Sequence, residues 1–537
     1  MERGTSTIRA GRTMPSNAVL AATCSKACKD GDPAAFKELV RLASLDPEAV
    51  RQAVQFDFSA LPDTGHTLQD HEESLARLTS PEMAREAFQS LEDLAEKLRR
   101  RGQNRIVYVT NNPWGGGGVS SLIQAQGRLA KLLGIELEWH RLHATHSNTA
   151  GVPRELYTAM HFGMGARDFD VREEMKPWLQ DVRDTYSLLQ TVAHDPTVAS
   201  VCLEDHQVAP LIPHFNDSRA FAAKPKPIMW RCHFDTLALT DAQARGDHDN
   251  PIIDFWHQTV GRFTRTLSPT DVVAYQRGAL IRDPHQQAPL AELSPGVDPL
   301  EPRNTPLTKV ELEAHLQEVE RDHNIKLPRA NTFVTGGRFV PQKGMAMVMR
   351  AFAEAAKEDP DVNLVIFGPN PSGDPIKDRY FDQLSRLHYS LEPHVRDRVF
   401  IVTGYTDVRR FYQLAAGDAD ESGRPGLPTI LMSFAEGYNL MVDEANVAGC
   451  PVLSTTAVKR MGESPDLEPW RVELRDLGVP DPDAHYRFED GRALPSSDEA
   501  LKIEQRLITP MVRAVRLRQQ DPKAYERSVD MNLSRLS

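Results

Sequence analysis

The stretch RIVYVTNNPWGGGGVSSLIQAQGRLAKLLGIELEWHRL, residues 105–142, determines the fold class that we predict for this chain. It opens with a short apolar strand, passes through a glycine-rich loop, and enters a helix with Leu122, Leu129 and Leu133 on one side. Gly134 ends this helix, and a second apolar strand follows. A strand, a helix and another strand within about forty residues form a βαβ unit, which implies a parallel sheet.

A second alternation of strands and helices begins at Asn331. Its short apolar segments are typical of buried strands, and they read TFVTG, VNLVIFG, VFIVTG, PTILMSF and CPVLST. Between the two halves, residues 291–307 are rich in Pro and charge, which favours a hinge. We therefore expect an α/β chain of two Rossmann-like, doubly wound domains that face each other across a cleft.

These changes of pattern predict four segments. The first is a helical N-terminal extension, and the second and third are Rossmann-like domains. The last is a C-terminal helix that could pack back on the N-terminal domain. The predicted bounds are 1–103, 104–300, 301–500 and 501–537.

Within the extension, one helix has clear start and stop signals. Ser80 and Pro81 are typical of a helix start, and Gly102 is typical of a helix end. The apolar residues between them recur at three and four, so we expect them to dock on a neighbouring domain; contact with a partner protein is the weaker alternative. They are Ala84, Ala87, Leu91, Leu94 and Leu98.

Composition and charge exclude several classes of function. A chain of 537 residues is long enough for two or three domains. Its net charge of −12 argues against binding to nucleic acid, and no apolar run is long enough to span a membrane. Five cysteines, an odd number, favour reduced thiols in a cytoplasmic protein, and Cys24 with Cys28 lacks the second pair that a zinc site needs.

Several candidate ligand-binding residues follow predicted strands, where open α/β sheets bind ligands. The glycine loop 115–118 lets the backbone approach a ligand at a helix N-terminus, although a tight structural turn is the alternative. Arg338 and Lys343, five positions apart, suit a diphosphate; taken alone, the pair is better explained as solvated surface charges. Glu436 and Glu444 flank the start of a later helix, where a favourable contact with the helix dipole is the alternative for Glu444.

The order of these pieces resembles that of the retaining nucleotide-sugar glycosyltransferases of family 4, which have the two-domain GT-B fold. The resemblance covers roughly residues 104–460, and its carboxylate block is the segment 433–455. Within that family the chain is most similar to the trehalose synthase group. The segments that carry this similarity are the glycine loop, IMWRCHFD at 228–235 and SPGVDPLEPRN at 294–304.

The resemblance implies a role for each candidate residue. Arg338 and Lys343 would hold the diphosphate of the donor and stabilise it as the leaving group. Glu444 would accept hydrogen bonds from the ribose hydroxyls, and Glu436 would lie beside the donor sugar. His233 would face this sugar from the first domain; a core histidine bonded to backbone is the alternative.

Other donor-binding residues are implied by the same resemblance. Gly116 and Gly117 would close on the donor phosphate and the acceptor, and Tyr405 would line the nucleotide base. The remaining positions taken from the carboxylate block are Gly437, Asn439 and Leu440. The donor would be a substrate of the UDP-, ADP- or GDP-glucose type, and we expect neither a cofactor nor a metal.

The implied function is retaining, metal-independent transfer of a hexosyl group, glucosyl in the first instance, from a nucleotide sugar to a small sugar or sugar-like acceptor. The first domain would hold the acceptor and the second the donor, and a homodimer is one allowed assembly. A retaining enzyme of the trehalose phosphorylase type and a non-catalytic nucleotide-sugar-binding protein are the alternatives. The phosphorylase would differ from a transferase in using inorganic phosphate in place of a nucleotide. The binding protein would bind the nucleotide sugar without turnover.

Two departures from the family pattern concern the site. The strand before the WRCH segment tends to end in a His-Asp pair in the trehalose synthase group, whereas this chain has Glu204-Asp205. That region helps to define the acceptor pocket, which puts trehalose as the product in doubt. The phosphate motif reads RFVPQK, which keeps both cations and replaces the usual acidic and aromatic residues.

Overall fold

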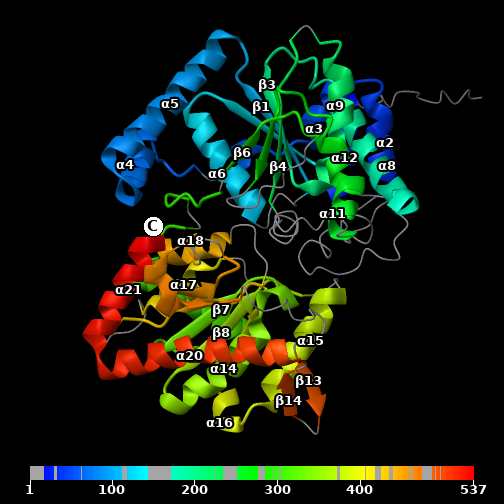
Figure 1. Ribbon diagram of the computed structural model, residues 1–537. Coiled ribbons are helices and arrows are strands. Elements are labelled where there is room, and N and C mark those ends of the chain that lie inside the picture. Colours follow the sequence, from blue (N-terminus) through cyan, green and yellow to red (C-terminus); the bar gives the residue numbers. More distant parts are fainter. Residues whose placement is uncertain are drawn as a thin grey trace, which may run out of the picture.

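The computed structural model describes two parallel six-stranded sheets, each covered by helices, in separate halves of the molecule (Figure 1). This architecture confirms the predicted α/β class with two Rossmann-like domains. The described residues are 17–536 without 30–32, 62, 112–117, 143–155, 157–170, 223, 234–250, 276–284, 294, 302–303, 372–374, 405–406, 418–424, 435–438, 459–460, 462–463, 475–485, 490–491 and 496.

The first sheet has the order β2-β1-β3-β4-β5-β6, and all of its pairings are parallel. Buried apolar residues such as Val107 and Val109 of β1 form its core, as expected for strands covered on both faces. The strands are β1 (Arg105–Thr110), β2 (Glu136–Arg141), β3 (Val198–Glu204), β4 (Ile228–Cys232), β5 (Val272–Tyr275) and β6 (Leu290–Glu292). The helices of this half include α6 (Gly118–Leu132), α8 (Val171–Leu189), α9 (Leu211–Arg219), α11 (Pro251–Trp256) and α12 (Arg262–Thr264).

The second sheet has the order β12-β11-β10-β7-β8-β9 and is also parallel. Its strands are β7 (Thr332–Gly336), β8 (Asn363–Gly368), β9 (Val399–Thr403), β10 (Thr429–Leu431), β11 (Val452–Thr455) and β12 (Arg471–Val472). Its helices include α13 (Lys309–His323), α14 (Met345–Glu358), α15 (Pro375–Ser390), α16 (Pro393–Arg396), α17 (Arg409–Ala416) and α18 (Leu440–Val447). A hairpin of β13 (Tyr486–Glu489) and β14 (Arg492–Pro495) follows.

The N-terminal helices are tied to the first sheet through a buried ion pair. Arg51 donates two hydrogen bonds of 2.6 Å to Glu138 on the edge strand β2, and both side chains are 2% exposed. Phe56 adds a backbone hydrogen bond to Trp139 on the same strand. These contacts cover the edge strand β2, whose backbone groups would otherwise be open to pairing with another strand. The helices are α1 (Asn17–Lys29), α2 (Pro33–Ala43), α3 (Pro47–Val54), α4 (Leu68–Leu78) and α5 (Pro81–Arg100).

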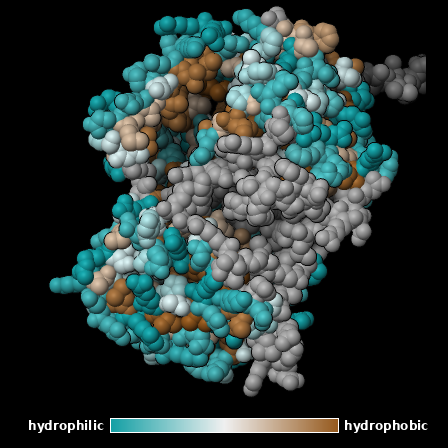
Figure 2. Space-filling model, in the orientation of Figure 1, coloured by the Kyte–Doolittle hydropathy of each residue, from teal (hydrophilic) through white to brown (hydrophobic). Residues whose placement is uncertain are grey.

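The helix predicted from Ser80 is α5, but its buried face differs from the predicted stripe. Ser80 caps the helix by accepting a hydrogen bond from the Met83 amide. Ala87 and Leu94 of the predicted stripe are exposed, whereas Phe88 and Ala95 are buried. Figure 2 shows apolar surface beside α5. The apolar residues cover more than one face of this helix, so their spacing alone does not identify the face that meets α6.

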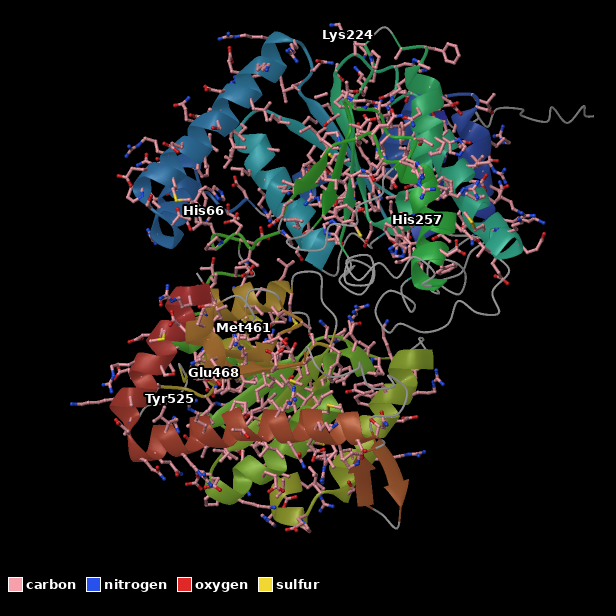
Figure 3. All side chains as sticks on the ribbon, viewed as in Figure 1. His66, Lys224, His257, Met461, Glu468 and Tyr525 are labelled. Atoms are coloured by element: carbon pink, nitrogen blue, oxygen red, sulfur yellow. The ribbon has the colours of Figure 1, made fainter. Side chains whose placement is uncertain are left out.

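The C-terminal helices α20 (Asp498–Gln520) and α21 (Pro522–Leu536) pack on the second domain. Tyr525 lies on α21 (Figure 3), and its hydroxyl donates to the Gly426 carbonyl. The Asn532 side chain of the same helix bonds both backbone groups of Val452. These contacts differ from the expected packing of residues 501–537 on the first domain. The apolar face of α20 instead joins the core on α14. The predicted domain limits themselves stay a prediction.

The segment between the two domains is held by side chains from both. Glu301 is buried and pairs with Arg128 of α6 in the first domain. A few residues later, the Gln413 side chain of α17 bonds both backbone groups of Leu307. Among the described helices, none is long and apolar enough to cross a membrane.

Candidate active site

Each sheet has a point at which successive connections leave in opposite directions. In the second sheet, the first strand β7 lies between β8 and β10; in the first sheet, β1 lies between β2 and β3. Ligands of open α/β sheets bind beyond the carboxyl ends of the strands at such a switch point. The residues that follow β7, β10, β1 and β3 are therefore the candidates for binding a ligand.

At the switch point of the second sheet, three polar side chains come together. Lys343 Nζ donates to Ser433 Oγ at 3.4 Å, and Asn439 Nδ2 donates to the same oxygen at 3.5 Å. Ser433 is buried just beyond β10, and its carbonyl accepts a 2.5 Å hydrogen bond from Thr455 at the end of β11. Ser433 thus links the lysine after β7 to Asn439, the residue that precedes α18. The spacing of charged residues alone did not predict this link.

Lys343 is held in a position that disfavours its charged form. Burial, with a smaller contribution from the nearby Arg338 guanidinium, lowers the pKa of Lys343 to about 7. Arg338 itself is exposed, next to Gly337 at the carboxyl end of β7. A bound anion would relieve the repulsion between these two cations. The pair lies at the end of β7, where an anion could bind, and its role as a diphosphate site stays a prediction.

The helix α18 presents its N-terminus to the same place. Asn439 precedes it with φ of +65°, a left-handed conformation that Asn tolerates better than most residues. Leu440 begins the helix and is partly exposed, while Glu444 is 7% exposed one turn later. The sequence places Glu444 beside the packed stripe of this helix, and in the structure its side chain is buried with those of Val442 and Ala445.

The two domains touch where α6 and α18 begin. A Cβ atom on Gly118, the first residue of α6, would lie 2.8 Å from Leu440 Cδ1. On the side of the second domain, a Cβ atom on Gly337 would lie 3.6 Å from Met441 Sδ and 3.6 Å from Lys343 Cε. The helix that follows the glycine loop therefore starts next to the lysine site.

Beside the switch point of the first sheet, His233, which follows β4, is held by a carboxylate from the neighbouring strand β3. The His233 Nε2 atom contacts Glu204 Oε2, and Arg231 Nη2 lies 3.2 Å from Glu204 Oε1. Glu204 is fully buried at the end of β3, and the His233 side chain is 6% exposed just after β4. His233 is thus neither a solvated residue nor a core residue bonded to backbone alone.

Asp205, the residue after Glu204, has a backbone conformation that is rare for a residue other than glycine. Its φ is +82° and its ψ is 170°, and such conformations often mark functional sites. Asp205 Oδ1 accepts a 3.4 Å hydrogen bond from the His233 amide. Burial alone would raise the pKa of Asp205, but hydrogen bonding to His206 and the proximity of His233 lower it below its ordinary value.

Of the predicted site residues, the structure describes His233, Arg338, Lys343, Asn439, Leu440 and Glu444. It brings Lys343, Asn439 and Leu440 into one site and places His233 at the corresponding end of the first sheet. The predictions for Gly116, Gly117, Tyr405, Glu436 and Gly437 lie outside the described residues. The roles assigned to all of these residues stay predictions.

Sequence reasoning missed Ser433 and did not foresee how Glu204 is used. Ser433 had a signal, because it ends an apolar strand segment and directly precedes the carboxylate block. The pairing of Glu204 with Arg231 and His233 required knowledge that β3 and β4 are neighbours, which no local pattern states. Among the described residues, there is no group of three or more His, Cys, Asp or Glu side chains that could hold a metal ion.

Models of two protein families match the two halves of the chain. The model described as "Trehalose synthase, N-terminal domain" matches residues 109–268, which include the first switch point and His233. The model described as "Glycosyl transferases group 1" matches residues 317–463, which include Lys343, Ser433 and Glu444. The two halves together are similar to glycosyltransferases, and the first half is similar to the trehalose synthases.

Curated relatives share this sequence similarity, and solved structures share the fold. Trehalose synthases of Thermococcus litoralis and Pyrococcus furiosus are each 24% identical over 377 residues, which cover 68% of this chain and 77% of the relative. The α,α-trehalose 6-phosphate synthase of Burkholderia multivorans superposes with a TM-score of 0.52 at 13% identity, covering 81% of this chain and 95% of that one. An Escherichia coli trehalose-6-phosphate structure bound with UDP-2-fluoro glucose has a TM-score of 0.50 at 11% identity, covering 80% and 99%.

For a trehalose synthase-like glycosyltransferase, the arrangement has a clear chemical logic. The second domain offers Arg338, Lys343 and the N-terminus of α18, all of which favour negative charge. The first domain offers a histidine held by two consecutive carboxylates. One side thus suits a diphosphate and the other suits hydroxyl groups.

Proposed function

We propose that this protein transfers a glucosyl group from a nucleotide sugar to a small sugar or sugar-like acceptor, with retention of anomeric configuration and without a metal ion. The observation that carries the proposal is the Lys343–Ser433–Asn439 cluster at the switch point of the second sheet. It presents a cation and a helix N-terminus to the place where this fold binds ligands. The similarity to trehalose synthases supports the substrate class.

The donor would place its diphosphate against Arg338 and Lys343. As the bond from the anomeric carbon to the phosphate breaks, negative charge grows on the diphosphate, and preorganised cations stabilise this charge. Because a dianionic ligand also raises the pKa of Lys343, binding would convert the lysine to its charged form. The buried Glu444 would accept hydrogen bonds from the ribose, and Glu436 would lie near the sugar.

The first domain would bind the acceptor and orient the donor sugar through His233. The segment that begins at Glu204 and Asp205 departs from the His-Asp pattern of the trehalose synthase group, so the acceptor is left as a class. We propose a neutral mono- or disaccharide, or a sugar-like polyol, as this class. Glu204 is balanced by Arg231 and Asp205 adds a further carboxylate beside His233, which favours a neutral sugar over a phosphorylated one.

The proposal is tested by incubating the protein with UDP-, ADP- and GDP-glucose and a panel of neutral sugars, after a thermal-shift screen has ranked the donors. We expect one donor to stabilise the fold and release its nucleoside diphosphate only when an acceptor is present. Full activity should survive a strong chelator. Activity that collapses with the chelator and returns with magnesium or manganese would contradict metal independence.

The same assay separates the two alternatives. Cleavage of trehalose by inorganic phosphate, without any effect of added nucleotide, would favour a phosphorylase. Stabilisation by a nucleotide sugar, without transfer or hydrolysis of any donor, would favour a non-catalytic binding protein. A cytoplasmic location and a homodimer stay predictions; light scattering after gel filtration tests the latter.

A further inference from the structure

The contact between Glu204 and His233 connects the ends of two adjacent strands. Glu204 lies opposite Arg231 in the parallel register of β3 and β4, two residues before His233. One oxygen of the buried carboxylate faces the Arg231 guanidinium, and the other contacts the imidazole Nε2. Because the Arg231 guanidinium balances the charge of the carboxylate, the other carboxylate oxygen can accept a hydrogen bond from the imidazole Nε2–H.

Asp205 holds the main chain of the same histidine. In a regular strand, consecutive side chains point to opposite faces of the sheet, so Glu204 and Asp205 would not meet one residue. The positive φ of Asp205 breaks this alternation at the end of β3. As a result, Glu204 contacts the His233 ring while Asp205 Oδ1 accepts a hydrogen bond from the His233 amide.

Two other titratable groups near Glu204, the Cys202 thiol and the Tyr108 hydroxyl, do not compete with His233 for its negative charge. Burial raises the pKa of the Cys202 thiol to about 12 and that of the Tyr108 hydroxyl well above its ordinary value. Both groups are therefore neutral near pH 7. Among the described residues, the other charged or titratable groups in contact with the two carboxylates include Arg231 on β4, beside Glu204, and His206, whose Nδ1 lies 3.6 Å from Asp205 Oδ1.

We propose that Glu204 is a positioning residue that holds His233 as the neutral tautomer with its proton on Nε2, and so presents the imidazole ring to the sugar in one fixed orientation. The inference rests on the proposed function, because it assigns His233 to a sugar-binding site. It also gives a purpose to the glutamate that stands where the trehalose synthase group tends to have histidine. Glu204 acts through His233 and is not itself a ligand of the sugar.

The kinetic test compares two buried carboxylates of the first domain. Glu204→Gln should lower kcat about ten- to a hundredfold with little change in donor KM, as loss of a carboxylate behind a functional histidine does. Asp271 is the matched control, because it is fully buried, pairs with Arg219 at 2.5 Å and bonds the Ile228 amide at the other end of β4. Asp271→Asn should lower the melting temperature and leave kcat unchanged.

A double-mutant cycle decides whether Glu204 acts through His233. The variants His233→Gln and Glu204→Gln/His233→Gln should have equal kcat, because the carboxylate has no effect once the imidazole is gone. Multiplicative losses would contradict the proposal and make Glu204 a direct substrate ligand. Glu204→Gln leaves Arg231 buried without its partner, so Glu204→Gln/Arg231→Gln serves if the single variant fails to fold.

A spectroscopic test needs neither activity nor a Glu204 variant. The imidazole of His233 is assigned by the difference between ¹⁵N-histidine NMR spectra of the wild type and His233→Gln. The proposal requires the pattern of the neutral Nε2–H tautomer in the wild type; the Nδ1–H tautomer would overturn it. A wild type that shows this tautomer but transfers no sugar would contradict the proposed function while supporting the positioning role.

Discussion

Gly118 and Leu440 meet at the boundary of the two domains, where a Cβ atom on the glycine would lie only 2.8 Å from the leucine Cδ1 atom. The helices that start at these residues follow β1 and β10, so the contact joins the two switch points. A side chain at position 118 must displace Leu440, which begins the helix that carries Glu444.

Gly118→Ala should therefore raise the donor KM about tenfold, since small displacements of binding groups are costly, while the melting temperature stays the same or rises. Gly296→Ala is the control, because among the described residues, apart from its chain neighbours, none has an atom within 4 Å of the position where its Cβ would be. Steady-state kinetics of both variants provide the measurement. The double variant Gly118→Ala/Leu440→Ala should recover part of the loss; equal KM values for all four proteins would exclude a role for this contact.

Much of the fold could be predicted from the sequence, since the strands are apolar runs and the helices have a regular period. The βαβ unit at residues 105–142 appears in the structure as β1, α6 and β2. The prediction of the buried face of α5 was wrong in part, because the exposed Ala87 and Leu94 extend the apolar stripe beyond that face. Local periodicity tells which residues are apolar, but the partner helix decides which of them are buried.

The candidate site could be predicted less completely, for a physical reason. Its residues become meaningful through contacts between strands far apart in the sequence, such as Lys343 with Ser433 or Glu204 with His233. The buried pair Arg51–Glu138 is another example, because each partner alone reads as an ordinary surface charge. The resemblance to a family supplied the roles of the residues, but not these links.

Lys343 should be required for turnover. Lys343→Ala should lower kcat about a hundred- to a thousandfold, as loss of a preorganised charge-stabilising group does. Because burial already disfavours the charged lysine, the variant should melt at the same temperature as the wild type or higher. Lys357→Ala, at an exposed pair with Glu354 in the helix that follows, is the matched control and should have wild-type kinetics. An unchanged kcat at saturating donor would remove Lys343 from the mechanism.

Donor affinity should depend on pH because the pKa of Lys343 is lowered to about 7 in the empty site. Below pH 7 the lysine is charged and binds the diphosphate without further cost. Above pH 7 the neutral Lys343 must take up a proton from the solvent when the ligand binds. The Kd should therefore rise by up to about tenfold per pH unit. Titration calorimetry between pH 6 and 9, in buffers with different ionisation enthalpies, measures both the Kd and the proton uptake.

Lys343→Arg is the control for this pH dependence, since arginine stays charged throughout this range. Its Kd should be nearly constant from pH 6 to 9. A wild-type Kd that is equally constant, without proton uptake, would mean that Lys343 is already charged in the empty site or does not contact the ligand.

Glu444 should act on the nucleotide in both the ground and transition states. Glu444→Gln should then raise the donor KM while kcat holds within a few-fold, as loss of uniform binding does. Glu436→Gln should instead lower kcat with a smaller change in KM, because charge develops on the sugar only in the transition state. A donor with 2′-deoxyribose gives an independent check. It should penalise the wild type more than the Glu444 variant, and equal penalties would show that Glu444 does not touch the ribose.

The most direct test of the account is the anomeric configuration of the product. The protein is incubated with an α-configured nucleotide glucose and an acceptor that supports nucleoside diphosphate release, and the new glycosidic bond is observed by proton NMR before any rearrangement. We predict an α-linked product formed in equal amount with the nucleoside diphosphate. A β-linked product, or free glucose without a glycoside, would contradict the claim that this chain is a retaining glucosyltransferase.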